Sequence, residues 1–207
     1  MISLLQMDIE AGEMLFQDDF TDENLSERWD PIPRGEWAAK NGVLTGCYRG
    51  NEGSLIYTRK SYSGDIILDF YARMVPPCDN DLNFTFRANG WNPETKCADV
   101  GYIGGLNGWW TKQAGLERYP DCALRSLSGF RAETGREYHI QTGIVGNTCF
   151  LAVDGEIVVT MSDPDPINDP NCGRVGLGVY YSWVEFRKFR LYRAVVHPVA
   201  REYTANF

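Results

Sequence analysis

The chain has 207 residues, of which 43% are hydrophobic and 13% aromatic, enough apolar side chains for one sizeable core. Its 20 basic and 28 acidic residues give a net charge of −8, which argues against a nucleic-acid partner because such partners call for a basic patch. No segment approaches the roughly 20 consecutive apolar residues of a membrane span, so we expect no membrane partner. The opening residues lack the basic region of a signal peptide, and we expect a cytoplasmic protein.

Three segments are predicted in chain order: an N-terminal tail over residues 1–13, a sandwich domain over 14–194 and a C-terminal tail over 195–207. Strands are predicted at 36–39 and 43–47, on either side of the pair Asn41-Gly42. An Asn-Gly pair between apolar runs is the strongest short-range signal for a β-hairpin, because both central residues of a type I′ turn need positive φ. The pair Asp154-Gly155 indicates a second hairpin further along the chain.

Further strands are predicted on both sides of one unusual region. They cover residues 14–16, 55–58, 65–74, 82–88, 137–144, 148–153, 156–161, 174–181 and 184–192. Residues 89–128 are instead rich in Gly, Trp and Asn, and only 98–106 is typical of a strand. A long irregular insertion in a compact domain is usually functional or disordered, and the tryptophans argue against disorder. We therefore expect a functional Gly/Trp-rich loop insertion here.

The spacing of these short strands, with almost no helical periodicity, predicts an all-β fold: a two-sheet antiparallel jelly-roll sandwich. Such sandwiches usually handle ligands on one curved sheet face. We expect the concave face to be crossed by residues 82–87, 100–106 and 175–181. The side chains on that face should then decide the function.

Several segments follow the order found in a known group of proteins. EWAAKNGVLTG, FTFR and GRVGLGVYYSWVEFRKFRL are arranged as in concanavalin A-like jelly rolls. Within that superfamily the chain most resembles the family named for 3-keto-disaccharide hydrolase, over residues 14–193. The resemblance implies a jelly-roll fold and a carbohydrate-active protein. The chain departs from the family in three places. Asp81-Leu82-Asn83 stands where Asn-Ser-Gly is usual, Ile103 stands where an acid usually follows Gly-Tyr, and Tyr180-Tyr181-Ser182 stands where Gln-x-His is frequent.

Three functions remain open at this point. The first is an enzyme that cleaves a glycosidic bond, by hydrolysis or by elimination from a 3-keto sugar, where the ketone acidifies the neighbouring C–H and one base can begin the reaction. The second is a non-catalytic carbohydrate-binding module, and the third is a structural or interaction domain. The expected partner is a mono- or oligosaccharide or a glycoside, with no cofactor required.

The first candidate site lies in the Gly/Trp-rich region. Indole faces can cover the apolar side of a sugar ring while amide and ammonium donors bind its hydroxyl groups. The alternative is that the tryptophans pack this loop onto the sheet. The residues concerned are Tyr102, Asn107, Trp109, Trp110 and Lys112.

A second candidate follows from alternation along one strand. A period of two puts four polar residues on one strand face, opposite Phe84 and Phe86: Asp81, Asn83, Thr85 and Arg87. We expect this polar face to bind substrate through fixed hydrogen bonds. Tyr181 could complete an aromatic rim, although a core position is an equal alternative.

The catalytic hypothesis rests on the best remaining carboxylate. Glu117 is expected to act as the base, with Arg118 or Lys112 stabilising negative charge on the substrate oxygen. The alternative for Glu117 and Arg118 is a solvated surface ion pair. A structural calcium is a further possibility at Asp19, beside Asp18 and the Asn41-Gly42 turn, because calcium prefers carboxylate and carbonyl oxygens. Turn capping by the aspartates is the alternative.

Overall fold

The structure is a computed structural model that describes residues 1–4, 6–32, 35–94, 97–109 and 111–199. Strands dominate it, and η1 is a single 3₁₀ turn. The elements are β1 (Ile2–Ser3), β2 (Met7–Asp18), η1 (Leu25–Glu27), β3 (Trp29–Pro31), β4 (Glu36–Lys40), β5 (Val43–Thr58), β6 (Ile66–Met74), β7 (Leu82–Ala88), β8 (Trp91–Asn92), β9 (Cys97–Ala98), β10 (Gly101–Gly108), β11 (Gln113–Tyr119), β12 (Arg125–Ser128), β13 (Tyr138–Val145), β14 (Thr148–Val153), β15 (Glu156–Ser162) and β16 (Arg174–Pro198).

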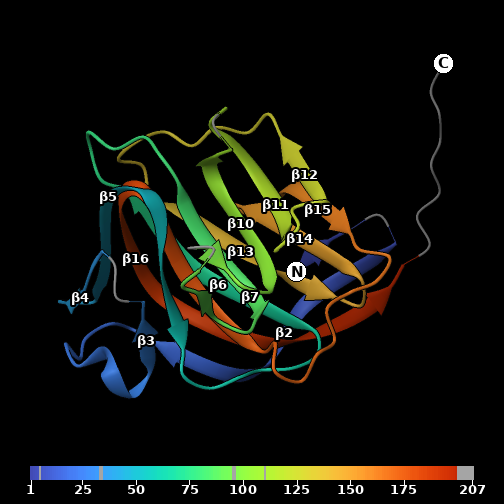
Figure 1. The fold of residues 1–207 in the computed structure, drawn as a ribbon. Helices are drawn as coiled ribbons and strands as arrows, with labels where there is room; N and C mark the ends of the chain where they lie inside the picture. The colour runs from blue at the N-terminus through green and yellow to red at the C-terminus, as the bar shows by residue number, and fades with distance from the viewer. Residues whose placement is uncertain (5, 33–34, 95–96, 110, 200–207) are drawn as a thin grey trace.

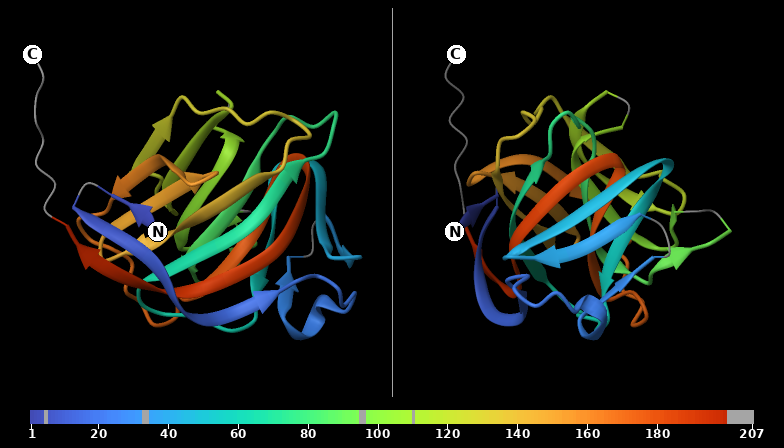
Figure 2. Two further views of the ribbon diagram at one scale, coloured as in Figure 1. Left: turned by 180° about the vertical axis from the view of Figure 1, so that it is seen from behind. Right: turned by 90° about the vertical axis from the view of Figure 1, so that its left-hand side faces the viewer.

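The long strand β16 joins the two layers of the sandwich. Its N-terminal half pairs with β5 and β7, and β7 continues through β10 and β11 to β12. Its C-terminal half pairs with β2 and β6, and β6 continues through β13 and β14 to β15. Figure 1 shows β2 beside the red C-terminal part of β16, and Figure 2 shows β5 beside its other half. We refer to the layer containing β7, β10 and β11 as the first layer.

The core lies between the layers and is built by alternate apolar residues. In β6, the alternating Ile66, Leu68 and Phe70 are fully buried, as the period of two requires. Phe70 meets Phe84 of the first layer edge to face, with ring centroids 6.1 Å apart. Such aromatic pairs add about 0.5–1.5 kcal/mol to the gain from burial. The all-β, antiparallel jelly-roll prediction is therefore confirmed.

Both predicted hairpin turns have the expected backbone. Asn41 and Gly42 have φ of 52° and 81°, and Asp154 and Gly155 have φ of 52° and 88°. Positive φ at both central residues is the requirement of a type I′ turn. These turns connect β4 to β5 and β14 to β15.

Two sequence predictions about irregular segments are corrected. Residues 7–13, predicted as part of a tail, belong to β2, which pairs with β16 from Pro198 to Phe189. The predicted loop insertion at 89–128 contains β10, β11 and β12, which extend the first layer. The prediction recognised most of β10 as the strand 98–106, but it missed β11 and β12, whose sequences QAGLERY and RSLS lack a clear apolar alternation. In the described part of the chain, no helix is long and apolar enough to cross a membrane.

Candidate functional site

The first layer turns a row of glycines away from the core. Asn83 of β7 lies between Gly178 of β16 and Gly105 of β10, and Gly105 pairs with Gly115 of β11. The core side of the same strands carries Leu82, Phe84, Leu106, Leu116 and Val179, all buried. We call the outward set Gly105, Gly108, Gly115 and Gly178 the glycine patch.

Three functional side chains lie directly over this patch. A Cβ added to Gly105 would come within 2.5 Å of the Asn83 Oδ1, and one added to Gly108 would come within 2.7 Å of an Asp81 carboxylate oxygen. At Gly115 the added atom would be 2.8 Å from the Trp109 ring. The glycines therefore leave room for an amide, a carboxylate and an indole to lie close to the sheet.

Glu117 lies at the β11 side of this face and is 4% exposed. Its Oε2 accepts a hydrogen bond from the Trp109 Nε1 at 3.0 Å. Its Oε1 accepts from the Arg125 Nε at 2.6 Å and also from Arg125 Nη2. Glu117 and Arg125 are direct cross-strand partners, and the carboxylate raises the pKa of the Arg125 guanidinium. Both oxygens are thus used to fix Trp109 and Arg125 in place.

Asp81 has a different environment. It precedes β7 with φ of 51°, a left-handed backbone that Asp tolerates better than most residues. Burial raises the pKa of its carboxyl group to about 7, although a hydrogen bond with Asn83 acts in the opposite direction. Tyr180 of β16 lies near enough for Asp81 to raise its pKa as well, after the larger effect of burial. Asp81 is therefore the group on this face that can change its charge near neutral pH.

The structure brings together only part of the predicted site. Asp81, Asn83, Trp109 and Glu117 lie on the outward face of the first layer. Tyr181 is 58% exposed at a bulge of β16, beside Tyr180. The predicted ligand-stacking residue Trp110 lies outside the described residues.

Arg87 does not share the face of Asn83. The alternation breaks at this residue, which has φ of 46° beside a register shift between β7 and β16. Its guanidinium is buried and donates to the Ile167 carbonyl at 3.0 Å and to Asn168 Oδ1 at 3.3 Å. The period-two prediction was wrong here because a bulge turns the side chain to the other side.

Arg118 does not orient Glu117, because neighbouring residues on a strand point to opposite faces. It pairs with Asp163 at 2.9 Å and donates to the carbonyl of Asp165 at 2.7 Å. Tyr102 is buried on the same side, and its hydroxyl donates to Asp163 at 2.7 Å. These two predicted ligand residues instead anchor the 163–167 segment to the first layer.

Asn107 and Lys112 also have structural partners. The Asn107 amide donates to the Asp79 and Ala132 carbonyls and accepts from the Ala132 N–H, so this 5% exposed side chain fixes two loops. Lys112 forms an ion pair with Asp79. The predicted catalytic set of Glu117, Lys112 and Arg118 is therefore not assembled in this arrangement.

A small apolar cluster covers the other end of the outward face. Ile103, at the position where the resembling family has an acid, packs with Tyr57 and Ala88. Ile32, Leu55, Trp91 and Tyr119 complete this cluster. The polar part of the face is thus limited to the end that carries the glycine patch.

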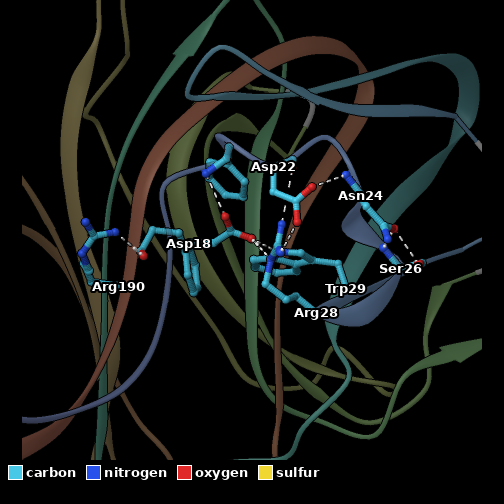
Figure 3. A network of polar contacts seen from close by, with 9 residues as sticks. Asp18, Asp22, Asn24, Ser26, Arg28, Trp29 and Arg190 are labelled. Atoms are coloured by element: carbon cyan, nitrogen blue, oxygen red, sulfur yellow. Dashed lines mark hydrogen bonds and ion pairs between the residues drawn. The ribbon is translucent and has the colours of Figure 1, made fainter.

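The Asp18–Asp19 pair, proposed for calcium, is already occupied by other groups (Figure 3). Asp18 accepts from the Phe20 N–H, the Arg28 Nε and the Trp29 Nε1, at 2.7–2.8 Å. Asp19 pairs with Arg190 at 2.6 Å. Two guanidinium groups bound to these carboxylates do not fit a calcium ion in this arrangement. Across the described residues, no group of three or more His, Cys, Asp or Glu side chains suits a metal.

Sequence reasoning missed Arg125 and the glycine patch. Arg125 lies in a segment that was expected to be irregular, so its pairing with Glu117 had no visible signal. The glycines were noted only as part of a Gly-rich region and not as a patch, yet Gly105, Gly108 and Gly115 fall on one face of two adjacent strands. Strand glycines that recur often mark the close approach of another group.

Comparison with known proteins gives the fold. No family model matches the chain, and no curated protein sequence matches it. A Bacillus subtilis protein with a galectin-like fold is similar, with a TM-score of 0.72 and 11% identity, over 91% of this chain and 99% of that one. A B. subtilis carbohydrate-binding module has a TM-score of 0.60 and 16% identity, over 79% of this chain and 94% of the module. A transglycosylase has a TM-score of 0.58 and 11% identity, over 89% of both chains. At these identities the likeness establishes the jelly-roll fold alone.

Proposed function

We propose that the protein binds a carbohydrate on the outward face of the first layer. One observation carries the proposal: Trp109, Asn83 and Asp81 lie side by side over a patch of sheet that has no side chains of its own. An indole supplies an apolar surface for the C–H side of a sugar ring, and the amide and carboxyl groups supply hydrogen bonds to its hydroxyls. Binding sites combine these two elements, an apolar surface and a few well-placed polar groups.

The similar structures support this proposal without settling it. Their names include a carbohydrate-binding module and a transglycosylase, both concerned with sugars. The resemblance of the sequence to 3-keto-disaccharide hydrolases points to the same class of ligand. A sugar ligand is therefore favoured over a purely structural role.

The structure supports sugar binding better than it supports hydrolysis of a glycosidic bond by a pair of carboxyl groups. Glu117 is on β11 and Asp81 immediately precedes β7, with β10 between these two strands. In the register of the sheet Glu117 is level with Thr85, about four residues from Asp81, so strand geometry puts the Cα atoms of Glu117 and Asp81 about 16 Å apart. Arg125, which holds Glu117, is on β12, on the far side of β11 from β7. Glycosidases place their two carboxyl groups about 5–10 Å apart. Both oxygens of Glu117 already accept hydrogen bonds from Trp109 and Arg125, so Glu117 is not available as the second carboxyl group of such a pair.

A second candidate, cleavage of a glycosidic bond by elimination from a 3-keto sugar, is favoured by Asp81 alone. That reaction needs one base rather than two acids, and a carboxyl group with a pKa of about 7 suits proton transfer at neutral pH. Asp81 would then take the role that the sequence assigned to Glu117. Incubation with 3-keto-glycosides and detection of products by mass spectrometry tests this candidate.

The binding proposal is tested with a glycan array followed by calorimetry on the sugars that bind. Trp109→Ala should weaken the affinity at least about tenfold, as expected for the loss of about 1.4 kcal/mol of stacking. Tyr71→Ala is the matched control, because it removes an aromatic ring from the outward face of the other layer, where Tyr71 stacks on His139. Absence of any sugar binding, or equal losses in both variants, would overturn the proposal.

A further inference from the structure

We propose that the Asp81 carboxylate is the acceptor for two adjacent hydroxyl groups of a neutral sugar, and that Asp81 loses a proton when this sugar binds. This inference rests on the proposed function, since it names the class of ligand and the group that selects it. It follows from the partners of Asp81, from its position over the glycine patch and from the charges around it.

Asp81 differs from the buried carboxylates of the protein in its partners. Asp18 is paired with Arg28, Glu117 with Arg125, and Asp163 with Arg118. Among the described residues no cation pairs with Asp81, and its carboxylate has only the Asn83 amide as a hydrogen-bond partner. A poorly solvated carboxylate can accept about four hydrogen bonds, so this one has unused acceptor capacity. Such a group requires donors from elsewhere when it ionises.

The position of Asp81 makes its free acceptor sites available to a ligand. One oxygen lies over Gly108, which has no side chain, and the residue remains partly exposed. Ser182 Oγ donates to the Asp81 backbone carbonyl at 2.8 Å, which helps to hold the left-handed backbone. A carboxylate fixed in this way and approached from above the sheet can accept from two neighbouring hydroxyls at once, the arrangement that a vicinal diol offers.

The charges around Asp81 favour a neutral ligand. Tyr180 faces it from β16 and stays uncharged near neutral pH, because its pKa is raised above its ordinary value of 10. In the adjoining segments, Asp79 and Lys112 neutralise each other, as do Glu117 and Arg125 further along the face. A uronic acid would bring a second negative charge close to Asp81, which forms no ion pair with any described residue, and like charges at close range disfavour each other.

Ligand binding should then change the proton affinity of Asp81. Hydroxyl groups that donate to a carboxylate stabilise its charged form, so the sugar lowers the pKa of Asp81 from about 7. By linkage, the complex releases a proton wherever Asp81 is protonated in the free protein. Affinity should rise with pH up to about 7 and stay constant above it, changing up to about tenfold per pH unit.

The experiment uses methyl glycosides of neutral hexoses, their deoxy analogues and the corresponding uronic acids, titrated into the whole protein. Calorimetry at pH 5.5, 6.5 and 8, in two buffers of different ionisation enthalpy, measures both the affinity and the proton release. We expect at least about tenfold tighter binding at pH 8 than at pH 5.5, weaker binding of one deoxy analogue, and no pH dependence in Asp81→Asn. Asp19→Asn is the control, because it removes an exposed carboxylate paired with Arg190.

A carbon NMR titration of the Asp81 side chain, without ligand and then with it, gives an independent readout if Asp81→Asn binds nothing. The inference is overturned if a neutral sugar binds equally well at pH 5.5 and 8, or if the sugar leaves the titration of Asp81 unchanged; the proposed function then stands. Preference for the uronic acids also overturns it. If no sugar binds at any pH, both the inference and the proposed function fail.

Discussion

Replacing Asp81 by Asn should stabilise the folded protein at neutral pH, in spite of the position of Asp81 in the candidate site. Burial raises the pKa of this carboxyl from 3.8 to about 7 in the folded state. Between these values the folded protein holds a proton that the unfolded chain has released, so the free energy of unfolding falls as pH rises, by about 1.4 kcal/mol per pH unit. Between pH 3.8 and 7 the free energy of unfolding therefore falls by at most about 4 kcal/mol.

Asn cannot ionise, has nearly the same shape, and keeps an oxygen that can accept from Asn83. The variant should therefore lack this pH-dependent loss. Urea unfolding of both proteins at pH 5, 6, 7 and 8 measures the difference, and we expect the advantage of Asp81→Asn to grow by about 3 kcal/mol from pH 5 to 8. Asp19→Asn, which removes an exposed ion pair, should differ from the parent by less than about 1 kcal/mol throughout. If the difference in the free energy of unfolding between Asp81→Asn and the parent were the same at all four pH values, the reasoning would be refuted.

Three other substitutions test the contacts around the site. Glu117→Gln should lower the free energy of unfolding by about 1–3 kcal/mol, because Arg125 loses its anion but is half-exposed, and urea unfolding checks this. Gly115→Ala should displace the Trp109 ring, which would shift the indole N–H resonance and weaken sugar binding at least about tenfold. A loss of affinity smaller than this would contradict the close contact between Gly115 and Trp109. Arg118→Met leaves Asp163 buried without its cation, so it should lower the free energy of unfolding by about 3 kcal/mol without changing sugar affinity. A reduced sugar affinity would instead support the contact between Arg118 and substrate that the sequence predicted.

Much of the fold follows from local patterns in the chain. Alternation in β6 identified a central strand, and the pairs Asn41-Gly42 and Asp154-Gly155 fixed two hairpins, because each signal depends on only a few neighbouring residues. β10 was predicted only as far as residue 106, and β11 and β12 were not recognised. Half of β10 is glycine, which has low β propensity, so this strand is stabilised by pairing with β7 and β11 rather than by its own composition.

The site was less predictable because it depends on strand register. Glu117 and Arg118 are neighbours in sequence, yet the true partner of Glu117 is Arg125, directly across the β11–β12 pair. Arg87 has the spacing of a residue on the face of Asn83, but one bulge turns it to the other side. A shift of one residue moves a side chain to the opposite face, and nothing in the sequence around these residues specified the shift.

The contrast between Glu117 and Asp81 shows why residue type alone did not single out Asp81. Both are carboxylates on one face, and the sequence favoured Glu117 because it was the best remaining carboxylate for acid–base work and lies next to Arg118. In the structure Arg125 occupies one oxygen of Glu117 and the Trp109 indole N–H occupies the other, so the carboxylate serves to position Trp109. Asp81 has one amide partner and no cation within the described residues, so its charge is poorly stabilised until a ligand supplies donors. In the proposed site, this smaller set of partners is what allows Asp81, rather than Glu117, to respond to a sugar.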